Sequence, residues 1–211
     1  MKRITLCALL MTLFLLSSCN NSGKDLTDDE VAKSDGTVID LAKITNNIKD
    51  SVAFAKDVKE VHSLVKSIDE LAKAIGKKID DNGIVADAAN KDNNGFLLSG
   101  VYQVIDVVTI KLGALEKITS TDESIKRQVA DSKSKGISFL GKLKSKKTEL
   151  GKKDASEDDA KKAVDRNNVD KSLGAQELIE LNTTIDALLA AAEAAVTSAI
   201  NELTTPVKPS N

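Results

Sequence analysis

A long apolar seam in the first half of the chain constrains its fold more than any other feature. Between residues 44 and 75, aliphatic residues recur every three or four positions, which places them on one face of an α-helix and is close to the coiled-coil repeat. A helix over residues 38–75 would be about 57 Å long at 1.5 Å per residue, and it could not bury this face alone. The seam therefore predicts partner helices. Its members are Ile44, Ile48, Val52, Ala55, Val58, Val61, Val65, Ile68, Ala72 and Ile75.

The remainder of the chain predicts those partners. Residues 96–118 are rich in β-branched side chains, so propensity alone leaves helix and strand open, but their apolar residues keep a helical period. Ser120 and Glu123 form a capping box that would open a helix running to Leu150. Ser156 would open a shorter helix ending near Gly174. The predicted fold class is an all-α helical bundle.

Two segments complete this outline. Residues 175–203 predict a last helix whose alanines allow close approach of a neighbouring helix. Residues 76–95 are interrupted by glycine, aspartate and asparagine, so we expect an irregular segment with one helical turn at 84–89.

The amino terminus predicts secretion and lipidation. A basic start, Met1–Arg3, precedes thirteen uncharged apolar residues, 4–16, which are too few to span a bilayer but typical of a secretory signal. Leu16–Cys19 (LSSC) has the pattern of a bacterial lipobox, in which the signal is cut between Ser18 and Cys19. Cys19 would then carry a diacylglyceryl group and an N-acyl chain. The alternative is an ordinary signal peptide that happens to end near a cysteine.

These features divide the chain into four parts. Residues 1–18 are the predicted signal peptide, 19–37 a flexible polar tether, 38–205 the helical bundle, and 206–211 a disordered tail. The formal net charge of −2 would become −4 once Lys2 and Arg3 leave with the signal, a mild acidity that does not suggest a nucleic-acid partner. With Cys7 removed and Cys19 acylated, no cysteine is left for a disulfide, so the bundle must be held together by packing.

Catalytic chemistry is not indicated. The single histidine, His62, cannot supply a metal cluster, and we expect it to be structural or solvated. Residues 136–142 resemble the start of a phosphate-binding loop but continue with Leu143 rather than Ser or Thr. Residues 90–95 resemble the start of a calcium-binding loop, whose twelfth position would be Val101 instead of glutamate. We therefore expect no enzymatic activity, no metal and no cofactor.

One cluster of charge is a candidate binding site. Six lysines form a basic run that could hold an acidic polysaccharide such as a glycosaminoglycan. The simpler interpretation is a solvated helix end, where cations also favour the helix dipole, and it is the one we favour. The lysine run consists of Lys142, Lys144, Lys146, Lys147, Lys152 and Lys153.

Several runs of sequence carry a resemblance to known proteins. They are Val58–Val61, Ser67–Ala72, Lys73–Ile79 and Asn82–Gly83, then Leu97–Tyr102, Phe139 with Lys142–Ser145, Leu150–Gly151, Gly174–Leu178 and Glu202–Pro206. These runs resemble one bacterial family, the Borrelia outer surface protein C and variable small protein lipoproteins, and the resemblance covers residues 38–208, nearly the whole mature chain. Two departures, a third helix without cysteine and a short tail, Val207–Asn211, with little positive charge, place the chain closer to the variable small proteins.

The resemblance implies an elongated bundle of four long helices plus a short one. It also implies a homodimer displayed on the cell outer membrane, acting as a variable major antigen whose switching evades host antibodies. The alternative is an adhesin or ligand carrier for a host glycosaminoglycan, a host protein or a small molecule. On the first interpretation, residues 76–95 and 151–174 are the expected epitope-bearing segments because they are the most polar.

Overall fold

The computed structural model describes residues 30–32, 38–118 and 122–203, and the chain forms two units. The smaller unit comprises Met1–Ala42 and Pro206–Asn211. In its described part, β1 (Glu30–Ala32) pairs antiparallel with β2 (Val38–Asp40), and Val31 lies opposite Ile39. The tether predicted over 19–37 therefore contains a short strand. The rest of that segment and the tail 206–211 lie outside the described residues.

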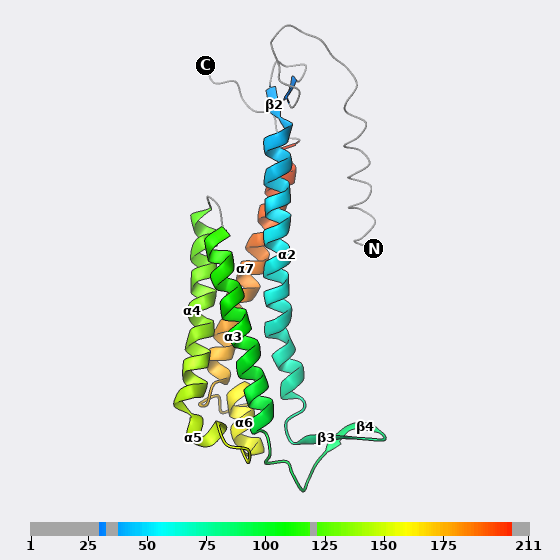
Figure 1. The fold of residues 1–211 in the computed structure, drawn as a ribbon, viewed down its shortest axis with the longest axis vertical. Helices are drawn as coiled ribbons and strands as arrows, with labels where there is room; N and C mark the ends of the chain where they lie inside the picture. Colours follow the sequence, from blue (N-terminus) through cyan, green and yellow to red (C-terminus); the bar gives the residue numbers. More distant parts are fainter. Residues whose placement is uncertain (1–29, 33–37, 119–121, 204–211) are drawn as a thin grey trace. The chain divides into compact units, whose positions relative to one another are not determined.

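The larger unit, Lys43–Thr205, is a helical bundle (Figure 1). The all-α class is confirmed, and four of the described helices are long; two short ones occur where the resemblance implied one. The long helices are α2 (Leu41–Ala72), α3 (Gly95–Ile118), α4 (Glu123–Ser145) and α7 (Ala175–Asn201). The short ones are α5 (Lys147–Leu150) and α6 (Glu157–Val164).

The core of this unit is almost entirely aliphatic. Helix α4 packs against both α3 and α7, and α2 runs beside them (Figure 1). By length and composition alone, α3 and α7 could each cross a membrane, but in the bundle both contribute residues to the core. Fully burying one such side chain contributes about 1.5–3 kcal/mol. The largest side chains with no exposed surface include Phe139, Ile68, Ile105, Leu112, Leu178, Leu181, Ile185 and Leu188.

The apolar seam of α2 is confirmed as buried in its second half, whereas in its first half Ile44, Ile48 and Ala55 are only half-buried. Val58, Val61, Val65 and Ile68 are buried, whereas Val52 is 48% exposed and no residue of α2 before Val58 is buried. The reason is the length of the neighbouring helices. Helix α3 ends at Ile118, and α2 extends beyond that end (Figure 1). Beyond that level α2 lacks the α3 surface that covers its second half.

Several helix ends differ from the predictions. Helix α2 begins at Leu41 because residues 38–40 form β2. Helix α4 begins at Glu123, where the Oδ1 atom of Asp122 accepts hydrogen bonds from the backbone nitrogens of Ser124 (2.8 Å) and Ile125 (3.2 Å). The predicted capping box is therefore wrong: Asp122 is the N-cap, Glu123 is the first helical residue, and Ser120 lies outside the described residues.

The start of α6 is predicted correctly, but its end is not. The Ser156 hydroxyl accepts a hydrogen bond from the Asp159 backbone nitrogen at 3.0 Å, and the helix ends at Val164 rather than near Gly174. A polar turn follows, in which the Asp165 carboxylate accepts from the Asn167 backbone nitrogen at 2.9 Å. Such side-chain bonds to the backbone compete with helix continuation.

Residues 77–86 form a β-hairpin rather than the predicted irregular segment with a helical turn. Strand β3 (Lys77–Asp80) pairs with β4 (Gly83–Ala86), and a two-residue loop joins them. The Asp80 carboxylate accepts from the Asn82 backbone nitrogen at 2.8 Å, and Gly83 has φ +97°, which an L side chain rarely adopts. This turn and the β-branched Ile84 and Val85 favour a hairpin over a helical turn.

Candidate functional site

The predicted lipidation and cleavage residues, Cys19 and Ser18, lie outside the described residues, so the acylated cysteine stays a prediction. Three features of the described bundle remain as candidate sites: the lysine run, a polar network between α2 and α7, and a pocket at the end of the bundle where α2 begins and α7 ends.

The structure divides the lysine run into two groups. Lys142 and Lys144 lie in the last turn of α4 and contact other helices. The Lys142 Nζ atom lies 3.4 Å from Glu177 Oε1, and the Lys144 Nζ atom lies 5.6 Å from the centre of the Tyr102 ring. The Tyr102 hydroxyl, through its hydrogen bond with the ammonium, raises the pKa of Lys144. These two side chains therefore serve the packing of α4.

The other four lysines follow α4: Lys146 lies between α4 and α5, Lys147 begins α5, and Lys152 and Lys153 lie in the next loop. Among the described residues, none of these four forms an ion pair. The acidic residues that follow them are not their partners. Glu157 and Asp158 of α6 each pair at 2.6 Å with a lysine four residues later in the same helix. The cationic surface is thus smaller than the sequence suggested.

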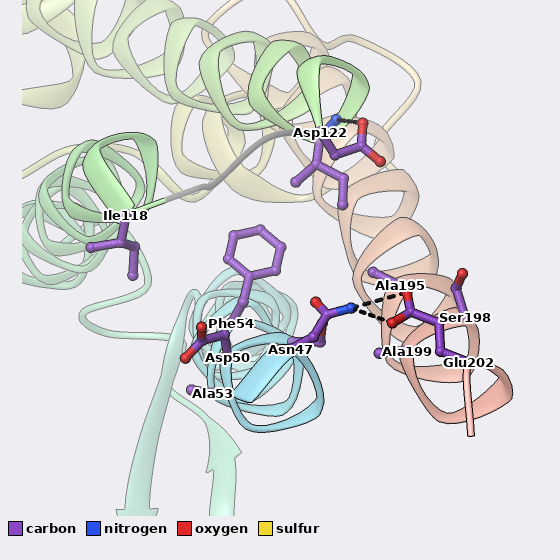
Figure 2. Close-up of a pocket in the computed structure, with 12 residues that line it drawn as sticks. Asn47, Asp50, Ala53, Phe54, Ile118, Asp122, Ala195, Ser198, Ala199 and Glu202 are labelled. Carbon is purple, nitrogen blue, oxygen red and sulfur yellow. Dashed lines mark hydrogen bonds between the residues drawn. The ribbon is translucent and has the colours of Figure 1, made fainter. Parts of the chain in front are cut away.

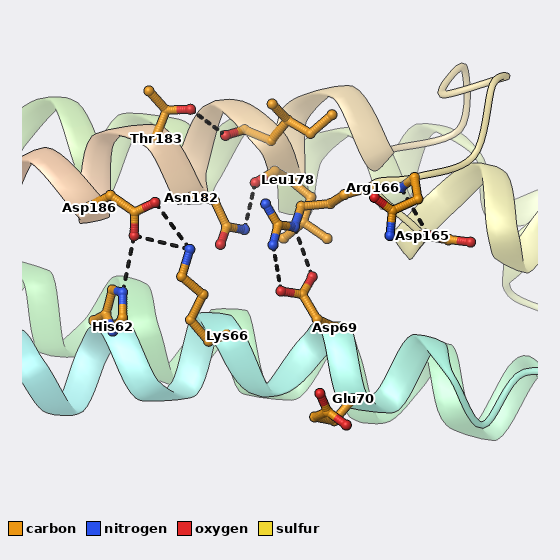
Figure 3. A network of polar contacts seen from close by, with 12 residues as sticks. His62, Lys66, Asp69, Glu70, Asp165, Arg166, Leu178, Asn182, Thr183 and Asp186 are labelled. Carbon is orange, nitrogen blue, oxygen red and sulfur yellow. Dashed lines mark hydrogen bonds and ion pairs between the residues drawn. The ribbon is translucent and has the colours of Figure 1, made fainter.

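A polar network ties α2 to α7 and to the turn before α7 (Figure 3). His62 Nε2 and Lys66 Nζ both lie 3.0 Å from Asp186 Oδ1. Arg166 donates two hydrogen bonds to the Asp69 carboxylate, one of them from Nε at 2.8 Å, and this pairing raises the pKa of the guanidinium. His62 therefore makes a structural contact, as expected from the sequence. Among the described residues, no group of three or more His, Cys, Asp or Glu could hold a metal ion.

A half-open pocket of about 480 Å³ lies between the first turns of α2 and the last turns of α7 (Figure 2). Its lining includes three carboxylates, those of Asp50, Asp122 and Glu202, and the Phe54 ring. No lysine or arginine is among its described lining residues. Both Glu202 oxygens accept hydrogen bonds from the Asn47 amide, at 3.0 and 3.1 Å. The site is therefore acidic, with an aromatic wall and an alanine floor from α7.

Sequence reasoning missed this pocket because its acidic residues come from three elements far apart in the chain. It also missed the structural role of Asn94, which lies in the segment that resembles a calcium-binding loop. Asn94 is 5% exposed; its Oδ1 atom accepts from the Gly76 backbone nitrogen, and its Nδ2 atom donates to the Ala155 carbonyl, both at 3.0 Å. The side chain thus joins the base of the hairpin to the loop before α6.

The segment that resembles a phosphate-binding loop is helical. Residues 136–142 all belong to α4, and Gly136 is buried where a Cβ atom would lie 2.7 Å from the Thr109 methyl group on α3. Gly136 therefore allows α3 and α4 to approach closely, and the match is coincidental, as the sequence indicated.

Comparison with known proteins gives these features a context. A family described as "Lipoprotein" matches residues 38–209. Variable small protein 11 of Borrelia hermsii is 47% identical over 212 residues, which cover 98% of each chain. Outer surface protein C of Borreliella burgdorferi is 44% identical over 98% of this chain and 96% of its own length.

The chain belongs to this lipoprotein family. The solved structure of variable small protein 1 of Borrelia turicatae is similar to this fold with a TM-score of 0.74 and 57% identity, covering 77% of this chain and 98% of that one. The family assignment made from the sequence is confirmed, and the higher identities to variable small proteins agree with the predicted subgroup. As a member of the variable small protein and outer surface protein C family, the chain is a surface lipoprotein.

Proposed function

We propose that this lipoprotein is anchored in the outer membrane through acylated Cys19 and acts there as a variable major antigen, in which exchange among variants evades host antibody. The observation that carries the proposal is the combination of divergence and retained architecture. Relatives align over nearly the whole chain although about half of the residues differ, and the fold persists at a TM-score of 0.74. An aliphatic core tolerates changes that keep volume and pattern, while exposed residues change freely.

The hairpin and the segment 151–174 are the proposed variable surfaces. In the hairpin, Ile79 and Ile84 lie opposite each other and are 83% and 64% exposed. The second segment is only partly available, because Ala160, Ala163 and Val164 of α6 are fully buried. We therefore expect antibody contacts at 152–154 and around Val169, which is 97% exposed, rather than along the inner face of α6.

Antibody mapping tests this proposal. Sera raised against the protein would be measured against a hairpin variant, Asp81→Lys with Ile84→Thr, and against a core control, Val108→Ile, with melting curves recorded for both. We expect the hairpin variant to lose a fraction of antibody binding with little change in stability, and the core control to lose none. Loss of antibody binding only in variants with a lowered melting temperature would contradict the proposal. Antibody binding would then depend on whether the protein is folded and not on which side chains the hairpin exposes.

We also propose that the bundle forms a homodimer through the open half of α2. Residues 43–57 include no buried residue, and Val52 is 48% exposed. Beyond Ala192, helix α7 has one buried residue, Ala199. Val52→Lys should shift the sedimentation coefficient toward the monomer, whereas Val169→Lys, at the 97%-exposed loop position, should not. A monomeric unmodified protein would contradict this proposal.

The pocket favours a second candidate function, that of a ligand carrier. Its carboxylates and its aromatic wall suit a small organic cation better than a polyanion. Titration with benzylammonium should give saturable binding that weakens in Asp50→Asn, and absence of binding at low salt would remove this candidate. The adhesin alternative, a glycosaminoglycan on the lysine run, predicts heparin retention that falls when Lys146, Lys147, Lys152 and Lys153 are neutralised.

A further inference from the structure

The chain contains two Asn-Gly dipeptides, Asn82-Gly83 and Asn94-Gly95, and the structure places them in opposite environments. An asparagine followed by glycine is chemically labile because the next residue has no side chain to hinder attack by its backbone nitrogen. That nitrogen attacks the asparagine Cγ atom, ammonia leaves, and a succinimide forms. Water then opens the ring at either carbonyl, giving aspartate or isoaspartate. The reaction needs a side-chain amide and a following peptide that are both free to move.

Asn82 meets the first requirement, and the peptide that follows it lies at the exposed end of the hairpin, where Gly83 begins β4 opposite Asp80. It lies in the two-residue loop of the hairpin, both Asn82 and Gly83 are exposed, and nothing lies within 4 Å of the position where a Gly83 Cβ atom would be. The backbone nitrogen of Asn82 donates to Asp80 at 2.8 Å. Among the described residues, the Asn82 side-chain amide makes no hydrogen bond that would hold it in place.

Asn94 does not meet them. Its amide nitrogen donates to the carbonyls of Lys91 (2.6 Å) and Ala155 (3.0 Å), and its amide oxygen accepts from Gly76. The nitrogen that would attack, that of Gly95, donates to the Lys153 carbonyl at 3.3 Å. A Cβ atom on Gly95 would lie 2.1 Å from the Lys152 carbonyl oxygen, so this peptide is packed against the neighbouring loop. Both reacting groups of this dipeptide are therefore engaged.

We propose that Asn82 is a site of spontaneous deamidation in the folded protein and that Asn94 is protected. Conversion to aspartate would add a third consecutive negative charge beside Asp80 and Asp81. Conversion to isoaspartate would add one atom to the main chain within the hairpin loop and disturb the pairing of Ile79 with Ile84. The exposed hairpin would thus change its surface chemistry with age without any change in the gene.

Peptide mapping of the purified full-length protein, aged at physiological pH and temperature, tests this proposal. Cleavage after lysine separates Asn82, in Ile79–Lys91, from Asn94, in Asp92–Lys111. We expect amide-to-acid conversion at Asn82, with isoaspartate detected by methyltransferase labelling, and conversion at Asn94 slower by about tenfold or more, because the start of α3 must first open locally. In denaturant the two rates should become similar.

Two controls make the outcome decisive. Fragmentation of Ile79–Lys91 distinguishes Asn82 from Asn90, which lies in the same peptide, and Asn82→Ser should abolish the conversion in that peptide. If folded protein converts Asn82 as slowly as Asn94 while the unfolded chain converts both, the hairpin protects its amide and the proposal fails. It also fails if the acid appears at Asn90 instead.

Discussion

At the scale of single residues, Phe139 and Gly174 lie where the second half of α4 meets α6 and the start of α7. Phe139 has no exposed surface, and a Cβ atom at Gly174 would lie 3.2 Å from its ring and 2.8 Å from the Ala163 carbonyl oxygen. Gly174 has φ +153°, so an alanine there would be strained as well as crowded. The whole chain has four phenylalanines. This one buried ring therefore fills core space that several rings would share in a more aromatic protein.

Truncation of this ring should be costly. Phe139→Ala should lower the free energy of unfolding by about 3–5 kcal/mol, because it removes a fully buried aromatic side chain and leaves a cavity. Phe96, which is 74% exposed at the start of α3, provides the control: Phe96→Ala should change stability by no more than about 0.5 kcal/mol. Denaturant unfolding of the two variants measures the difference. Equal effects would show that the assigned burial is wrong.

At the scale of helices, substitutions at two glycines of α4 should distinguish the effect of helix propensity on stability from the effect of packing between helices. Gly136 faces α3 at a distance that leaves no room for a Cβ atom, whereas nothing lies within 4 Å of a Cβ atom at Gly141. Gly141→Ala should therefore raise the free energy of unfolding by about 0.5–1 kcal/mol, the usual gain in a helix interior. Gly136→Ala should instead lower it by about 1–3 kcal/mol, since the Thr109 side chain must move. Stabilisation by both substitutions would mean that α3 and α4 lie farther apart.

The contact between α4 and α7 should also depend on pH. The hydrogen bond from Lys135 to Glu180, 2.9 Å long, lowers the pKa of Glu180 and raises the pKa of Lys135. A lowered carboxyl pKa contributes stability above the ordinary value of 4.5, and this contribution is lost as the pH falls through the lowered pKa. Glu180→Gln should thus be less stable than the unmodified protein near neutral pH, with the difference shrinking toward zero in acid.

Unfolding experiments at neutral and at acid pH measure this effect. Salt should reduce it because the Lys135 and Glu180 side chains are 36% and 41% exposed. Glu70→Gln is the matched control, since Glu70 pairs with Lys73, three residues later at the end of α2, rather than with another helix. A pH-independent difference between Glu180→Gln and the unmodified protein would contradict the assigned ion pair.

At the scale of the whole molecule, structural features that follow from a repeating pattern along the sequence were predicted. Features formed by residues far apart in the chain were missed. The seam of α2 and the period of α3 predicted a bundle because helical spacing persists over many turns. The hairpin was not predicted from the sequence because both strands are four residues long and neither has a buried face. No alternation of apolar and polar residues therefore marks them. The pocket was not predicted because Asp50, Asp122 and Glu202 lie close together only in the folded bundle.

The exposed first half of α2 shows a related limit. Val52 fits the spacing of the seam, yet it is 48% exposed. Periodicity identifies which face of a helix is apolar, but not how far the neighbouring helix extends along it. The family assignment was more secure because it rests on runs of sequence spread from α2 to the end of α7, and the match over residues 38–209 covers all of them.

We propose that acyl chains on Cys19 hold this bundle at the cell surface. Mass analysis of the amino-terminal peptide of native protein, isolated after brief protease treatment of intact cells, tests it most directly. We predict a peptide beginning at Cys19 with a diacylglyceryl group on sulfur and an acyl chain on nitrogen, accompanied by loss of the bundle from protease-treated cells. A peptide beginning at Met1, or an unmodified Cys19 thiol, would contradict the account.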